Sequence, residues 1–94
     1  MNIGESIAFI RKRQDMTQAQ LADKADIAIT ALSMIETGYR HPSKKILDKI
    51  AQVFGIAPEV ITFLSLDIKS IPDSKKAEFR KLHSNFKNLV WELV

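Results

Sequence analysis

The chain has 94 residues, enough for one compact domain with a modest core but too few for two domains. Apolar residues make up 46% of it and charged residues 27%, with only three glycines and three prolines. This composition excludes a disordered or fibrous chain and favours a globular domain rich in helices. The net charge of +3 permits a nucleic-acid partner without requiring one.

The chain contains no cysteine, which excludes disulfides, thiolate metal sites and a cysteine nucleophile, and fits a reducing cytoplasm. His41 and His83 are too far apart in sequence to form a two-histidine metal motif, so neither a metal nor another cofactor is expected. No apolar run approaches the roughly 18 residues that span a bilayer. We therefore expect a soluble cytoplasmic protein without membrane contact, and no nucleophile and base of an enzyme are visible.

The first part of the chain predicts three short helices. Isoleucines at helical spacing and the cationic stretch "RKRQD" predict a helix over residues 3–14. Thr17 and Gln20 have the spacing of a capping box, so the second helix begins at Thr17. The chain then turns at Asp26, because aspartate tolerates the left-handed backbone conformation, and a third helix follows over 28–37.

Two more helices complete the predicted domain. Ser43 caps a fourth helix over 44–54, whose apolar stripe ends at Gly55. Pro58 lies near the first position of a fifth helix, which runs to about residue 64.

The C-terminal part differs in pattern. Residues 65–71 form a polar connector, and a last helix occupies 72–94. Its apolar residues recur at steps of three and four, which is the a/d spacing of a helix that pairs with another helix: Phe79, Leu82, Phe86, Leu89 and Leu93. This spacing does not distinguish packing on the chain's own domain from pairing with a second chain. The predicted fold is therefore all-α, a five-helix domain followed by a helix that is a candidate dimerisation element.

Five short helices with a tight turn between the second and third describe a helix-turn-helix domain. Over residues 3–64 the sequence resembles the Cro and phage-repressor type, or XRE, family. The shared elements recur in register across four helices and are together highly specific: Arg11, "TQAQLA" from Thr17, Ser33, Ile35 with Glu36, Gly38, Arg40, Pro42 and "IAQVFGI". The resemblance implies a helix-turn-helix motif over 17–37 whose third helix, 28–37, enters the major groove of DNA.

The resemblance also implies three groups of site residues. Arg11 and Glu36 are similar to an ion pair that bridges the first helix to the end of the third. Phosphate contacts are expected at the start of the second helix and around the start of the fourth, from Thr17, Gln18, Tyr39, Arg40, His41, Ser43, Lys44 and Lys45. Base contacts are expected from the outward face of the third helix, from Ala28, Ile29, Thr30, Ser33 and Met34. Phosphate contacts position such a protein, and base contacts specify the sequence that it reads.

This outward face departs from the family, whose members commonly carry long polar side chains there. Only Thr30 and Ser33 can form hydrogen bonds, while Ile29 and Met34 offer apolar surface to thymine methyl groups. A site rich in A·T pairs is therefore expected. A small rotation of the helix would instead place Ile29 at the edge of the core.

Four further departures lie elsewhere. Ala28 replaces the usual serine or threonine cap, so the third helix is expected to begin with an unsatisfied amide. Asp15 and Asp26 stand where glycine is frequent. Phe9 lies on a helix face that is generally polar in the family, which predicts broader core packing, with the C-terminal helix as one partner for it, and a dimer contact as the alternative.

We expect a repressor-like transcriptional regulator that binds double-stranded DNA as a homodimer on a palindromic operator. A phage repressor, a restriction-modification controller and an antitoxin all fit, and an antitoxin would also bind a toxin or another protein. The alternative from a different class is a protein-interaction module that kept the fold and lost specific DNA binding. The apolar outward face of the third helix supports that alternative.

Overall fold

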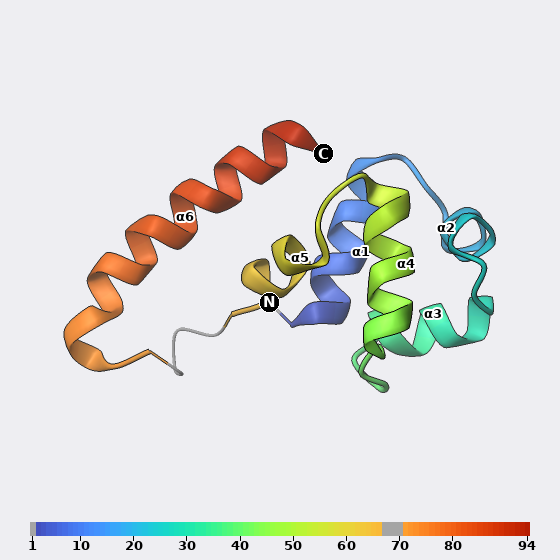
Figure 1. Cartoon of the computed structure of the whole chain (residues 1–94), viewed down its shortest axis with the longest axis horizontal. Coiled ribbons are helices and arrows are strands. Elements are labelled where there is room, and N and C mark those ends of the chain that lie inside the picture. The colour runs from blue at the N-terminus through green and yellow to red at the C-terminus, as the bar shows by residue number, and fades with distance from the viewer. Residues whose placement is uncertain (1, 67–70) are drawn as a thin grey trace.

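A computed structural model describes residues 2–66 and 71–94, apart from the side chain of Leu93. Within these residues the fold is all-α, as predicted, with helices α1 (Ile3–Arg13), α2 (Gln18–Ala25), α3 (Ile29–Glu36), α4 (Lys44–Phe54), α5 (Pro58–Leu64) and α6 (Lys76–Leu93), and a 3-10 turn at Asp73–Lys75. Figure 1 shows α1, α4 and α5 at the centre, α2 and α3 on one side and α6 on the other. Most of the predicted connector, 65–71, lies outside the described residues.

The core draws one apolar face from each of the first five helices. Its largest fully buried side chains are Ile7, Ile10, Leu21, Leu32, Ile35, Ile50, Ile61 and Leu64. α1 packs against α3 and α5, and α4 packs against α2 and α5. Because burial of apolar surface is the main favourable term in folding, this shared core holds α3 in a defined orientation.

Side-chain caps begin three of the helices. The predicted capping box is confirmed: the Thr17 amide donates to Gln20 Oε1 at 2.9 Å, and the Gln20 amide donates to Thr17 Oγ1 at 3.1 Å. Ser43 caps α4, as predicted, by accepting from the Ile46 amide at 3.2 Å. At the start of α1, Asn2 Oδ1 accepts from the Glu5 amide at 2.8 Å.

The two turns around α2 depend on aspartates in the left-handed region. Asp15 has a φ of 57° and Asp26 a φ of 55°. Glycine is frequent at both positions in the family that the sequence resembles. An aspartate adopts this left-handed backbone conformation at a higher conformational cost than glycine does. Ala28 precedes α3 with no side-chain cap, as expected.

The close approach of α1 and α3 requires a glycine. A Cβ atom on Gly4 would collide with the backbone carbonyl of Ile35. This contact holds the N-terminal turn of α1 against the last turn of α3, next to Glu36.

α6 packs on the side of the domain formed by α1 and α5. Phe9 stacks on Trp91 with ring centroids 4.3 Å apart, and Arg13 donates from Nε and Nη2 to the Trp91 carbonyl at 2.9 and 2.7 Å. On α5, the carbonyl of Phe63 lies 2.9 Å from His83 Nε2. Phe9 thus packs against the C-terminal helix within the chain.

The predicted seam of α6 divides between two faces. Phe79 and Phe86 turn toward α5, where their rings lie 6.4 and 4.5 Å from that of Phe63. Leu82 and Leu89 remain 64% and 55% exposed. Both alternatives that the spacing left open thus apply to different residues: α5 supplies aromatic area that holds the two phenylalanines within the chain, and the two leucines stay candidates for pairing with a second chain. The side chain of Leu93 lies outside the described residues.

Candidate nucleic-acid interface

The turn between α2 and α3 is short and built on small residues. The Asp26 amide donates to the Asp23 carbonyl at 3.2 Å, and the Ile27 amide donates to the Ala22 carbonyl at 3.0 Å. Ala22 and Ala25 are buried. Because alanine has a small side chain, neighbouring helices can approach α2 closely at these positions.

In the structure, the face of α3 that is expected to contact bases points outward; we call it the reading face. Leu32 and Ile35 are fully buried, whereas Ile29 is 47% and Met34 is 39% exposed. Ala28 and Thr30 are also exposed, and Ser33 is half-buried. The alternative position of Ile29, at the edge of the core, therefore does not apply. All five predicted base-contact residues, Ala28 just before α3 and the other four on it, therefore keep surface that is accessible to solvent.

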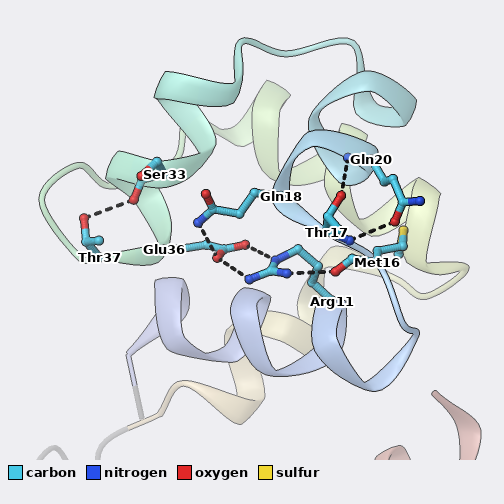
Figure 2. A network of polar contacts seen from close by, with 8 residues as sticks. All are labelled: Arg11, Met16, Thr17, Gln18, Gln20, Ser33, Glu36 and Thr37. Carbon is cyan, nitrogen blue, oxygen red and sulfur yellow. Dashed lines mark hydrogen bonds and ion pairs between the residues drawn. The ribbon is translucent and has the colours of Figure 1, made fainter.

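Arg11 and Glu36 form the predicted ion pair, and it is buried. Arg11 Nε lies 2.7 Å from Glu36 Oε2, and Nη2 donates to Oε1 at 3.0 Å. The remaining terminal nitrogen, Nη1, donates to the Met16 carbonyl at 2.8 Å. Figure 2 shows how this guanidinium links the end of α1, the turn before α2 and the last turn of α3.

Gln18 joins the same network from the first position of α2. Its Nε2 donates to Glu36 Oε1 at 3.0 Å (Figure 2). Sequence reasoning assigned Gln18 to phosphate alone and missed this bond. Glutamine carries two amide hydrogens and a carbonyl oxygen. The bond to Glu36 therefore leaves one hydrogen at the N-terminus of α2, where backbone amides favour an anion.

A second exposed polar group follows α3. Its members are the predicted phosphate contacts on the loop and at the start of α4: Tyr39, Arg40, His41, Ser43, Lys44 and Lys45. Two features anchor this loop. The Arg40 amide donates to the Met34 carbonyl at 3.1 Å, and the Pro42 ring is buried. Gly38, with a φ of 82°, turns the chain out of α3.

Two of the predicted phosphate contacts also act as helix caps. The hydroxyl oxygens of Thr17 and Ser43 accept backbone bonds, which leaves each hydroxyl hydrogen free to be donated. Each residue precedes a helix N-terminus, at Gln18 and at Lys44. The positive ends of α2 and α4 thus add to the side-chain donors that a phosphate would meet.

Asn2 lies beside this loop and was not predicted as part of the site. Asn2, Gly38, Arg40 and His41 line one small hollow of about 120 Å³. The sequence signal for Asn2 is its N-cap position, three residues before Glu5. Its place near Arg40 depends on the packing of α1 on α3, which no local pattern reports.

Residues 2–66 and 71–94 contain no cluster of three His, Cys, Asp or Glu side chains that could hold a metal ion. None of the helices formed by these residues is both long and apolar enough to cross a membrane.

Comparison with known proteins agrees with this geometry. The sequence model of the family described as "Helix-turn-helix" matches residues 7–61. The competence pilus inhibition repressor of Acinetobacter baylyi is 37% identical over 65 residues, which cover 69% of this chain and 59% of the relative. The immunity repressor protein of Bacillus phage phi105 is 38% identical over 61 residues, which cover 65% of this chain and 42% of the relative.

The chain thus matches about half the length of these curated relatives. No solved structure matches it with significance. The family match covers more than half of the chain and includes α2, the turn and α3. The chain belongs to the helix-turn-helix family, of the XRE type that its sequence resembles.

Proposed function

We propose that this protein is a transcriptional repressor that binds double-stranded DNA with α3 in the major groove. The observation that carries the proposal is the exposed face of α3, from Ile29 to Met34, together with two groups of phosphate donors on neighbouring elements. One group lies at the start of α2 and the other around the start of α4. Two relatives that bear the name repressor are 37% and 38% identical to this chain over 65 and 61 residues.

Base recognition would rest on few polar atoms. Thr30 and Ser33 supply hydroxyl groups, and the exposed side chains of Ile29 and Met34 supply apolar surface. The methyl group of thymine is the main apolar feature of the major groove. We therefore propose an A·T-rich half-site.

Phosphate binding would provide most of the affinity that does not depend on sequence. Arg40, Lys44 and Lys45 are exposed cations around the N-terminus of α4, and Gln18 is oriented by Glu36 at the N-terminus of α2. Each phosphate that a cation neutralises releases counterions from DNA, so binding must weaken as salt rises.

A single α3 makes few base contacts, which supports action as a homodimer on a palindromic operator. When two copies are joined, the second half-site is bound as an effectively intramolecular event. Such a protein acts on a chromosome or a phage genome, which supports a cytoplasmic location in a bacterial host.

A second candidate function is a protein-interaction module, including an antitoxin that binds a toxin. The observation that favours it is the apolar character of the exposed α3 surface, on which Ile29 and Met34 are both accessible and few polar groups are present. In that case α3 would dock a protein and the cationic residues would be solvated surface.

Fluorescence anisotropy with a random-sequence duplex at two salt concentrations separates these functions. The DNA-binding proposal expects affinity that falls steeply as salt rises. Absence of binding at low salt would contradict it and leave the interaction module.

A further inference from the structure

The outer face of α6 carries two leucines that the domain does not bury. Leu82 and Leu89 are 64% and 55% exposed, more than any other large hydrophobic side chain of the described residues except Tyr39. They are seven residues apart, which is about two helical turns, so they share one side of α6. The aromatic residues of α6, by contrast, face α1 and α5.

The surface around Leu82 has the form of a socket for a side chain. A shallow hollow of about 350 Å³ is lined by Glu78, Lys81, Leu82 and Asn85. These positions are i, i+3, i+4 and i+7, the four residues that make the hole for a knob in paired helices. Leu89 lies on the same face of α6, one turn beyond Asn85, the last residue that lines the hollow.

We propose that this hollow receives Leu89 of a second copy of the chain, with the two α6 helices antiparallel. The inference deepens the proposed homodimer and rests on it. A two-fold symmetry axis midway between Leu82 and Leu89 places Leu82 of each copy opposite Leu89 of the other copy. One contact then creates its mirror contact, so a single face serves both copies.

The charges beside the leucines are complementary in this arrangement. Lys81 and Glu92 are exposed and eleven residues apart, which is about three turns, so they flank the same side of the leucine face. Antiparallel pairing brings Lys81 within about two residues, or roughly 3 Å along the axis, of Glu92 in the second copy. A parallel pair would instead place Glu78 opposite Glu78 of the second copy and leave Lys81 without an acid.

The size of the contact sets its strength. One pair of short helices buries less than the roughly 1,200 Å² at the lower end of stable interfaces. The copies therefore associate weakly in free solution, and adjacent half-sites on DNA would strengthen their association through effective concentration.

The absence of native cysteine makes the arrangement testable by cross-linking of the full chain. Leu82→Cys and Leu89→Cys are mixed under mild oxidation without DNA. The antiparallel pair predicts a disulfide between the two variants and little cross-linking of either alone, because two copies of one position lie about 10 Å apart along the axis. Ala77→Cys, exposed on another side of α6, serves as the control and should stay monomeric.

Each other result is decisive. Cross-linking of each variant with itself would overturn the antiparallel arrangement in favour of a parallel one, and cross-linking no faster than that of the Ala77→Cys control would overturn the α6 interface. Because no DNA is present, either result leaves the proposed DNA binding untouched, which the salt-dependent anisotropy measurement decides.

A charge exchange provides a second readout. Sedimentation should show association of Lys81→Glu weakened about tenfold and that of the double variant Lys81→Glu, Glu92→Lys restored to near wild type. Failure of the double variant to restore association would contradict the register of the two helices.

Discussion

Gln18 Nε2 donates to Glu36 Oε1 at 3.0 Å, so the carboxylate that pairs with Arg11 also holds the first side chain of α2. One buried acid thus links α1, α2 and the end of α3. This relationship connects stability with the proposed function, since the orientation of Gln18 and the placement of α3 depend on the same group.

Glu36→Gln should destabilise the domain. The substitution removes the negative partner of a buried guanidinium, and an unpaired buried charge costs about 3–5 kcal/mol. Thermal denaturation should show a large fall in the melting temperature. Lys12→Gln, which removes an exposed charge from the same helix as Arg11, should leave it almost unchanged. Equal stability of the two variants would mean that the ion pair has no structural role.

Gln18→Ala should weaken binding to every duplex by about the same factor. A hydrogen bond to a charged group contributes about 1.5 kcal/mol or more, which is roughly tenfold in affinity. Because glutamine is neutral, the salt dependence should keep its slope. Titration of specific and random duplexes measures both quantities. A loss confined to the specific duplex would place Gln18 among the base-reading residues instead.

Several features of the fold followed from local patterns in the sequence. The capping box of Thr17 and Gln20, the cap at Ser43 and the turn at Asp26 each involve residues close in sequence, and each is confirmed. Such signals can be read locally because donor and acceptor are three residues apart.

Other features depend on packing between distant segments. The bond from Gln18 to Glu36, the close approach at Gly4 and the aromatic contacts of Phe63 join elements whose relative positions only the folded core defines. The spacing of three and four residues between apolar side chains predicts that α6 has an apolar face. It does not predict which of these side chains pack within the chain and which stay exposed. The sequence alone therefore could not predict that Phe86 packs against α5 while Leu89 stays exposed.

Arg40→Ala should weaken binding uniformly across sequences and lower the slope of the salt dependence by about one phosphate contact. The reason is that Arg40 is an exposed cation on the loop after α3 and is not one of the proposed base-contact residues. Affinities at several salt concentrations measure the slope. An unchanged slope would remove Arg40 from the phosphate contacts.

Thr30→Ala should relax the preference at one or two base pairs and leave the slope unchanged. Thr30 supplies one of two side-chain hydroxyls on the α3 face, and a good base contact is worth about 1–3 kcal/mol of discrimination. Competition between duplexes that differ at single positions measures the preference. A uniform loss across these duplexes would mean that Thr30 contacts the backbone of DNA.

Selection of bound sequences from a random duplex pool tests the central claim, specific DNA binding through α3, most directly. The expected result is an inverted repeat of A·T-rich half-sites, in which the Thr30→Ala variant loses the preference at one or two positions of each half-site. A pool with no enriched sequence would contradict specific DNA binding itself.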